Sequence, residues 1–188
     1  MKLNLVLDLT GQRMPQLPTL WKKSSPTKNG IHIALTLLDL SKAFDCVWHP
    51  ILLFKMEFYG VGGIAYELFR SYLMNRKQQV MYQNMQSGLR EVKFGVPQGS
   101  VLGPLIFILY VNDLPVHSNL TKHILYADDT TLISTDINID IAKNKAKINE
   151  MSASCWFYAN KLTINNDKTN NIIFPANRKY LQNNHVKF

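Results

Sequence analysis

Three aspartates stand where their carboxylates can act together on a metal ion. Asp39 ends an alternating apolar stretch that predicts a strand over residues 31–37, and Asp128 and Asp129 separate two further short apolar stretches. Two carboxylates about 4 Å apart repel by roughly 4 kcal/mol at an effective dielectric near 20, so a cluster of them favours a bound divalent cation. Oxygen ligands select Mg²⁺ or Mn²⁺ over zinc. A pair of such ions can activate a hydroxyl and stabilise a departing phosphate oxygen. An Asp-Asp pair is also ordinary turn chemistry, and the aspartates alone leave that alternative open.

The charge distribution favours a polyanionic partner. The chain has a net charge of +8 and a pI near 9.5. Residues 1–30 and 160–188 each carry a net charge of +4, whereas residues 31–159 are neutral overall. Within the neutral part, a basic stretch over 70–93 suits phosphates and an acidic stretch over 113–140 suits cations. On charge alone, a solvated surface is the alternative.

Length and composition indicate one globular domain and exclude a disordered tail or a coiled coil. Of the 188 residues, 46% are hydrophobic and 18% are charged. The longest apolar run, 101–111, is interrupted by Gly103 and Pro104 and is too short for a bilayer span of roughly 20 residues. The start of the chain meets Asp8 before a signal-peptide core develops. Cys46 and Cys155 form neither a disulfide framework nor a zinc motif. We therefore expect an intracellular protein, in cytoplasm or nucleus, without membrane contact.

The order of expected helices and strands predicts an α+β domain. The expected elements are a strand at 31–37, helices at 50–60 and 64–74, a hairpin of 77–83 and 89–94 with its turn at 84–88, a helix at 104–112, a hairpin of 123–127 and 130–135, a helix at 139–159, and strands at 162–164 and 171–174. We expect the last helix to bury one stripe, made of Ile141, Ile148, Met151, Cys155 and Tyr158. This order fits helices packed on one face of a largely antiparallel sheet. Residues 1–30 are expected to be a poorly ordered lead-in.

Four segments in a fixed order resemble the reverse transcriptase domain of non-LTR (LINE-like) retrotransposons. They are LDLSKAFDCV (38–47), GVPQGSVLGPLIF (95–107), LYADDT (125–130) and LTINNDKT (162–169). The resemblance runs over residues 31–174 and implies a polymerase palm. It also implies that the fingers are incomplete, that the thumb is absent and that residues 175–188 are a truncated tail before the primer grip.

The resemblance implies catalytic roles for residues at matching positions. Asp39, Asp128 and Asp129 match the catalytic aspartates, which would hold two Mg²⁺ ions, or Mn²⁺, with help from the carbonyl of Leu40. Lys168 matches a candidate proton donor to the leaving pyrophosphate, although a solvated surface lysine is the alternative.

The resemblance also implies a nucleotide pocket. Phe44 would lie under the sugar of the incoming nucleotide, where its ring excludes a 2′-hydroxyl. Lys42 lies where the family binds the triphosphate. Gln98 and Gly99 match a loop that positions the template base and the incoming nucleotide, and glycine there permits close backbone approach. A core phenylalanine and a surface lysine are the alternatives for Phe44 and Lys42.

The implied function is RNA-directed DNA polymerase chemistry, with deoxynucleoside triphosphates (dNTPs), an RNA template and a DNA primer. One alternative is a catalytically incompetent remnant that still binds nucleic acid, since the upstream fingers segment, the primer grip and the thumb are not recognised in the chain. Another is an RNA-dependent RNA polymerase, but such a site must admit a 2′-hydroxyl where Phe44 stands. The sequence carries no signal for the oligomeric state.

Overall fold

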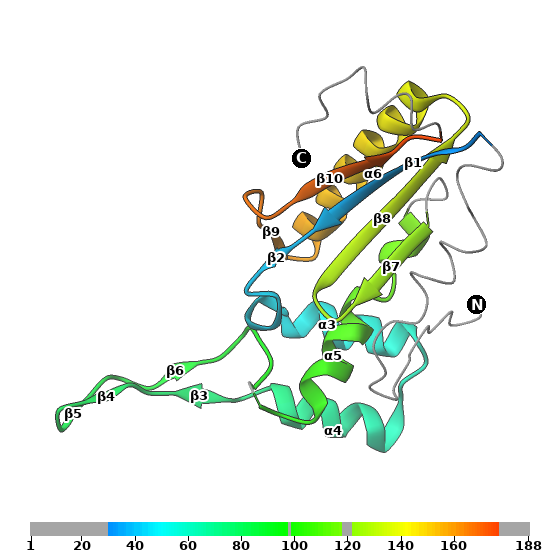
Figure 1. The fold of residues 1–188 in the computed structure, drawn as a ribbon. Coiled ribbons are helices and arrows are strands. Elements are labelled where there is room, and N and C mark those ends of the chain that lie inside the picture. Colours follow the sequence, from blue (N-terminus) through cyan, green and yellow to red (C-terminus); the bar gives the residue numbers. More distant parts are fainter. Residues whose placement is uncertain (1–29, 98, 118–121, 177–188) are drawn as a thin grey trace.

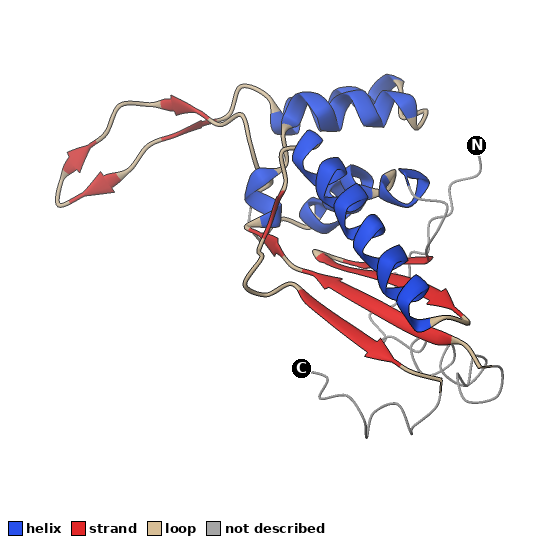
Figure 2. Cartoon of the chain, turned by 90° about the horizontal axis from the view of Figure 1, so that it is seen from above, coloured by secondary structure: helices blue, strands red, loops and turns tan. Residues whose placement is uncertain are grey.

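The computed structural model describes residues 30–97, 99–117 and 122–176, and its centre is a four-stranded antiparallel sheet (Figure 1). The strands lie in the order β10 (Asn170–Phe174), β1 (His32–Leu38), β8 (Asp129–Asp136) and β7 (Lys122–Tyr126). Figure 2 shows the helices gathered on one side of this sheet. The predicted α+β architecture, with helices on one face of an antiparallel sheet, is confirmed.

Alternating burial along the two central strands explains this arrangement. The side chains of every second residue are buried, namely Ala34, Thr36 and Leu38 of β1 and Thr130, Leu132 and Ser134 of β8. These six residues are direct partners across the ladder, so they share one face of the sheet. The residues between them are half-buried or exposed. One face of the sheet therefore belongs to the core beneath the helices.

In the part of the chain that the structure describes, four α-helices complete the core. They are α3 (His49–Phe58), α4 (Gly63–Leu73), α5 (Leu102–Val111) and α6 (Ile139–Ala159). Helix α3 matches the helix predicted at 50–60, and Pro50 lies in its first turn, where its missing N–H costs nothing. Helix α5 begins two residues earlier than predicted, because Pro104 also fits a first helical turn. The Asn138 side chain caps α6 by accepting hydrogen bonds from the N–H groups of Asp140 and Ile141.

The bounds of α6 agree with the prediction, but its predicted buried stripe is wrong. Cys155 is exposed, and 46% of Ile141, 56% of Ile148, 62% of Met151 and 82% of Tyr158 are exposed. The side that packs on the sheet consists of Ile139, Ala142, Ala146, Asn149, Ala153, Trp156 and Phe157. Ala142, Ala146 and Ala153 let the middle of the helix approach the strands closely, and Trp156 and Phe157 fill the core at its end.

A long two-stranded hairpin over residues 76–93, here called the arm, extends away from the rest of the described chain (Figure 1). Its strands are β3 (Lys77–Gln78) with β6 (Arg90–Glu91), and β4 (Met81–Tyr82) with β5 (Met85–Gln86). The turn lies at Gln83–Asn84, with φ values of 44° and 66°. Positive φ at both central residues makes this a type I′ turn, which suits hairpins. The predicted turn at 84–88 is therefore wrong, because residues 85 and 86 already belong to the returning strand.

The remaining short elements surround the end of β1. Strand β2 (Leu40–Ser41) pairs with β9 (Thr163–Ile164), and the 3₁₀-helix η1 (Ala43–Cys46) follows β2. A second 3₁₀-helix, η2 (Leu114–His117), follows α5. Within the described ranges no helix is long and apolar enough to cross a membrane. The predicted lead-in lies outside the described residues except for Gly30, and so does most of the predicted tail at 175–188.

Candidate active site

The strand register brings Asp39 alongside the turn that carries Asp128 and Asp129. Leu38, the last residue of β1, is the partner of Thr130 in β8. Asp39 directly follows Leu38 and Asp129 directly precedes Thr130, so both lie at the same end of adjoining strands. Directly opposed residues in an antiparallel pair have Cα atoms about 4.5–5.5 Å apart. The backbone therefore places all three aspartates at one end of the sheet.

The alternation of side chains directs Asp39 and Asp129 away from the helices. Leu38 and Thr130 are buried in the core, and neighbouring residues along a strand point to opposite faces. Asp39, which follows Leu38, and Asp129, which precedes Thr130, therefore belong to the face away from the helices. The side chain of Asp39 is 29% exposed, Asp128 is half-buried and Asp129 is exposed. These carboxylates are therefore at least partly exposed to a ligand that approaches from the face away from the helices.

The turn between β7 and β8 has two residues, as predicted, but it lies one residue earlier in the chain than the predicted turn at Asp128 and Asp129. Tyr126 pairs with Asp129, which leaves only Ala127 and Asp128 in the loop. Asp129 is thus the first residue of β8 and not a turn residue. Ala127 has a φ of 51°, a left-handed conformation that costs an L-residue about 1–2 kcal/mol. The strained residue, Ala127, directly precedes Asp128, and such strain is common at functional sites.

The three carboxylates do not form a closed group in the structure. Among the residues that the structure describes, no three His, Cys, Asp or Glu side chains are grouped closely enough to hold a metal ion. Mutual repulsion of like charges opposes such a group. The oxygen donors themselves are of the type that Mg²⁺ and Mn²⁺ prefer. The strand register therefore brings the three aspartates to one end of the sheet, whereas their joint binding of a metal ion stays a prediction.

Lys168 is brought to Asp39 by a turn that is hydrogen-bonded to the aspartate backbone. The N–H of Asn165 donates to the carbonyl of Asp39 at 2.8 Å. The N–H groups of Lys168 and Thr169 donate to the carbonyl of Asn165 at 3.2 and 3.1 Å. The amino group of Lys168 lies 3.7 Å from Oδ2 of Asp39, and its side chain is 68% exposed. An exposed cation thus lies next to the first aspartate.

Phe44 packs on α5, which follows the Gly/Pro-rich loop over residues 95–101. Its ring centroid lies 4.9 Å from that of Phe107 in α5, and the ring is half-buried against the core. The core alternative therefore describes part of the Phe44 side chain, and the rest of it is exposed. Lys42 is exposed and takes a left-handed conformation, with φ 50°, immediately before η1. Lys42 and Phe44, which follow Asp39 closely in the sequence, are therefore both at least partly accessible to a ligand.

The Gly/Pro-rich loop is fastened to the segment that follows Asp39. The N–H of Val96 donates to the carbonyl of Phe44 at 3.0 Å, and the N–H of Gly95 donates to the carbonyl of Val47 at 2.8 Å. Gly95 has a φ of 81°, and a Cβ there would lie 3.0 Å from the carbonyl oxygen of Asp45. Gly99 is exposed with a φ of 77°. The predicted role of Gln98 falls on a residue outside the described ranges.

Comparison with known proteins assigns the chain to a family. Residues 4–188 match the family model described as reverse transcriptase (RNA-dependent DNA polymerase). The chain is a reverse transcriptase family member. The match includes most of the residues set apart above as a lead-in, and that domain boundary stays a prediction.

Curated relatives of this reverse transcriptase domain come from mobile elements. The chain is 33% identical over 148 residues to the RNA-directed DNA polymerase from mobile element jockey of Drosophila melanogaster. It is 34% identical over 146 residues to the probable RNA-directed DNA polymerase from transposon X-element of the same species. These alignments cover 75% and 76% of the chain but only 16% of each relative. The resemblance to non-LTR retrotransposons is confirmed, and the chain spans about a sixth of the length of these relatives.

Solved structures confirm the palm-type fold of the reverse transcriptase domain. Apo telomerase from Candida tropicalis, truncated from its C-terminal domain, matches with a TM-score of 0.61 and 16% identity over 87% of the chain and 35% of that protein. Telomerase from Candida albicans, in complex with a fragment of telomeric RNA, matches with a TM-score of 0.62 and 16% identity over 84% of the chain and 29% of that protein. At such low identity the likeness concerns the fold alone.

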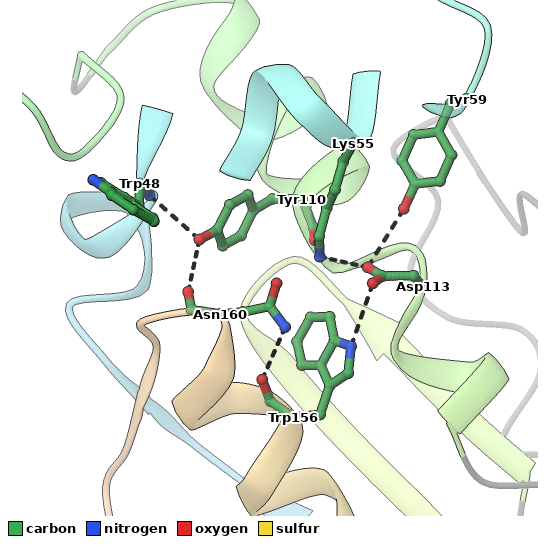
Figure 3. Close-up of polar contacts among 7 residues, drawn as sticks. All are labelled: Trp48, Lys55, Tyr59, Tyr110, Asp113, Trp156 and Asn160. Carbon is green, nitrogen blue, oxygen red and sulfur yellow. Dashed lines mark hydrogen bonds and ion pairs between the residues drawn. The ribbon is translucent and has the colours of Figure 1, made fainter. Parts of the chain in front are cut away.

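A polar network near the candidate site joins three of the helices that support the sheet (Figure 3). The Lys55 amino group donates to Oδ1 of Asp113 at 2.6 Å and to the carbonyl of Tyr110 at 2.7 Å. Only 9% of the Lys55 side chain is exposed. The ammonium also lies 4.5 Å from the ring centroid of Trp156 and 5.0 Å from that of Tyr110. The network thereby links α3, α5 and α6.

Tyr110 connects the network to segments next to the aspartates. Its hydroxyl donates to the carbonyl of Asn160 at 2.6 Å and accepts from the N–H of Trp48 at 3.4 Å. Trp48 follows η1, and Asn160 precedes β9, which pairs with β2. Sequence reasoning missed this residue and Lys55. A lysine among the apolar residues of α3 was the available signal, since a buried lysine needs a partner.

Burial shifts the pKa values of three side chains in this network, those of Lys55, Tyr59 and Tyr110. Desolvation lowers the pKa of Lys55, and the hydrogen bond and charge of Asp113 oppose that shift. Burial likewise raises the pKa of Tyr110 to about 12, while its hydrogen bond from the Trp48 backbone acts in the opposite direction. Burial also raises the pKa of Tyr59, whose hydroxyl lies 3.4 Å from Asp113. The two tyrosines therefore stay neutral as donors, and Asp113 stabilises the charged form of Lys55.

Proposed function

We propose that the aspartate end of the sheet is the site of RNA-directed DNA polymerase chemistry. In this reaction the 3′-hydroxyl of a DNA primer attacks a dNTP that is selected by an RNA template. The observation that carries the proposal is the register of β1, β8 and β7, which places Asp39 beside Asp128 and Asp129. Membership of the reverse transcriptase family supports the same reading.

Two Mg²⁺ ions, or Mn²⁺, are the proposed cofactors, held by Asp39, Asp128, Asp129 and the carbonyl of Leu40. Such ions would activate the attacking hydroxyl and stabilise charge on the leaving oxygen. The protein supplies hard oxygen donors on two strand ends whose positions are fixed by the ladder. Lys168, 3.7 Å from the Asp39 carboxylate, is proposed to deliver a proton to the leaving pyrophosphate.

The nucleotide pocket is proposed to lie between η1 and the Gly/Pro-rich loop. The open side of Phe44 would contact the sugar and exclude a 2′-hydroxyl. Lys42 would approach the triphosphate from the exposed start of η1. Gln98 and Gly99 would position the template base and the incoming nucleotide. The hydrogen bond from Val96 to Phe44 supports a pocket whose two walls keep a fixed separation.

The nucleic-acid partners are proposed to be an RNA template and a DNA primer. Lys77, Arg90 and Lys93 are exposed at the base of the arm, and Arg76 is half-buried beside them. Glu91 is the one acidic residue between 76 and 93. Lysine and arginine bind phosphates without regard to sequence. The arm is therefore the proposed contact for the sugar-phosphate backbone.

Primer extension on an RNA template tests the proposal. The chain spans about a sixth of the length of its curated relatives, and the remaining parts of such proteins would help to position the primer and the dNTP. A misplacement of about 1 Å in such chemistry costs roughly a hundredfold in rate. The chain alone should therefore extend a primer no faster than background. A chimera in which residues 30–176 replace the matching segment of the jockey polymerase supplies the positioning parts of that protein. This chimera should extend the primer with dNTPs in Mg²⁺, and Asp129→Asn should abolish extension. A folded chimera that binds the primer and template without extending would contradict the proposal and favour a non-catalytic remnant.

A further inference from the structure

Helix α6 carries a second, unexpected apolar face. We define the α6 seam as the six residues Ile141, Asn144, Ile148, Met151, Cys155 and Tyr158, all of which are exposed. Within the described ranges no element packs on them, because the opposite face of α6 already covers the sheet. A solvated helix face is ordinarily polar. An exposed stripe of large apolar side chains indicates an interaction surface.

The spacing of the α6 seam is that of a helix–helix interface. Successive members are separated alternately by three and four residues, which is the repeat that keeps one stripe of a helix against a partner helix. The seam spans 18 of the 21 residues of α6. One polar residue, Asn144, interrupts the apolar positions, and such a residue fixes register. The fitting occupant is therefore another α-helix that bears the same repeat.

A second copy of α6 in antiparallel orientation matches this seam. About its midpoint, Ile141 faces Tyr158 of the second copy, Asn144 faces Cys155, and Ile148 faces Met151. Two-fold symmetry makes each of these contacts occur twice. Apolar residues therefore meet apolar residues, and the asparagine meets a small thiol.

The charges that flank the seam favour the antiparallel orientation. Lys147 borders the first half of the seam, together with Lys145, which is ion-paired with Asp136 at 2.6 Å. Ser152 and Ser154 border the second half. An antiparallel pair places the lysines of one copy beside the serines of the other. A parallel pair would place lysines beside lysines, and like charges across a helix pair are unfavourable.

We propose that the α6 seam is a homodimer interface. Two α6 helices pack antiparallel through the faces that point away from their own sheets. This inference is independent of the proposed polymerase function. A helix of 21 residues is about 31 Å long, so one helix pair buries less than the roughly 1,200–2,000 Å² of a standard interface. The dimer is therefore concentration-dependent.

Sedimentation of the purified chain over a concentration series tests the interface. The chain should shift from monomer to dimer, and Ile148→Glu should weaken the dimer at least tenfold, which corresponds to about 1.4 kcal/mol. Ile64→Glu is the matched control, since Ile64 is 92% exposed on α4 and should leave association unchanged. Circular dichroism melting would verify that both variants fold. A chain that stays monomeric at its solubility limit, or equal effects of both variants, would overturn the proposal.

Disulfide cross-linking tests the orientation. Asn144→Cys should form a disulfide with Cys155 of the second copy when oxidised glutathione accepts the electrons and protons of the two thiols. The unaltered chain should not cross-link through Cys155, because the antiparallel register separates the two Cys155 residues. Peptide mass spectrometry would identify the bond. Cross-linking of Cys155 to Cys155 in the unaltered chain, or none in Asn144→Cys, would overturn the antiparallel dimer.

Discussion

Gly95 is the residue at which the loop before α5 comes closest to the segment after Asp39. An added Cβ would meet the backbone of Asp45 at 3.0 Å, and the φ of 81° is unfavourable for any L-residue. Gly95→Ala should therefore lower the free energy of unfolding by at least about 2 kcal/mol, which combines left-handed strain of about 1–2 kcal/mol with the steric contact. Urea denaturation would measure the loss.

The matched control for Gly95 is Gly60, which has a φ of 86° but no atom near an added Cβ. Gly60→Ala should cost only the left-handed strain, about 1–2 kcal/mol. Equal losses for the two variants would show that the contact with Asp45 is unimportant to the fold.

A substitution of Phe44 tests how the proposed site selects the sugar of the incoming nucleotide. In the chimera, Phe44→Val should relax discrimination against ribonucleotides by roughly tenfold to a few hundredfold, because a sterically excluded hydroxyl is worth about 1–3 kcal/mol. Phe44→Tyr should retain discrimination because it keeps the ring. The ratio of kcat/KM for dNTP and ribonucleotide is the measurement. Phe54→Val is the control, since Phe54 is exposed on α3. An unchanged ratio in an active Phe44→Val enzyme would show that Phe44 serves only the core.

At the scale of elements, the ion pair of Lys55 and Asp113 holds α3 against the end of α5. Asp113→Asn should lower the free energy of unfolding at pH 7 by about 1–3 kcal/mol, because the buried ammonium of Lys55 loses its counter-charge. Glu67→Gln is the control: its pair with Arg70 is exposed, and such pairs contribute about 0–1 kcal/mol. A loss no larger than that of the control would contradict a structural role for the pair.

The same variant should change how stability depends on pH. Burial holds the folded pKa of Lys55 below its ordinary value of 10.5, and Asp113 opposes this shift. Between the folded pKa and 10.5 the unfolded chain binds more protons, so stability rises with pH in that window. Removing the Asp113 charge widens the window. Asp113→Asn should thus regain part of its lost stability as the pH rises from 7 towards 10, and a constant difference would argue against titration of Lys55.

Sequence patterns predicted elements better than they predicted surfaces. The alternation of apolar residues predicted β1, and Pro50 and Gly60 as start and stop signals predicted α3, because these signals are local. The buried face of α6 was misjudged because burial depends on which side approaches the sheet, and that side used alanines. The position of Asp39 beside Asp128 followed from the family motifs, whereas the support by Lys55 and Tyr110 arises from contacts between distant residues and has no local pattern.

At the scale of the whole molecule, positive charge is concentrated at the arm and the chain ends. Lys77→Gln, Arg90→Gln and Lys93→Gln together should weaken binding of RNA–DNA hybrid at low salt. The slope of log K against log salt should become less negative by about 2, since each lost phosphate contact contributes about 0.7–0.9. Fluorescence anisotropy at several salt concentrations would measure the slope.

The control for the arm is a set of lysines elsewhere with the same loss of charge. Lys143→Gln, Lys147→Gln and Lys161→Gln remove three exposed lysines from α6 and its end. If the net charge of the chain alone determines binding of the RNA–DNA hybrid, both triple variants should change the slope of log K against log salt equally. That outcome would contradict a specific role for the arm.

The central claim is that Asp39, Asp128 and Asp129 form one cation site, and paramagnetic broadening by Mn²⁺ tests it most directly. In NMR spectra of the chain, amide signals of residues 39–40 and 127–130 should lose intensity first as Mn²⁺ is added, because these residues flank the three carboxylates at one end of the sheet. Asp128→Asn should require more Mn²⁺ for the same loss, and Asp140→Asn, in an exposed pair with Lys143, should not. Broadening centred on another acidic segment, or broadening at 127–130 without residues 39–40, would contradict the shared site.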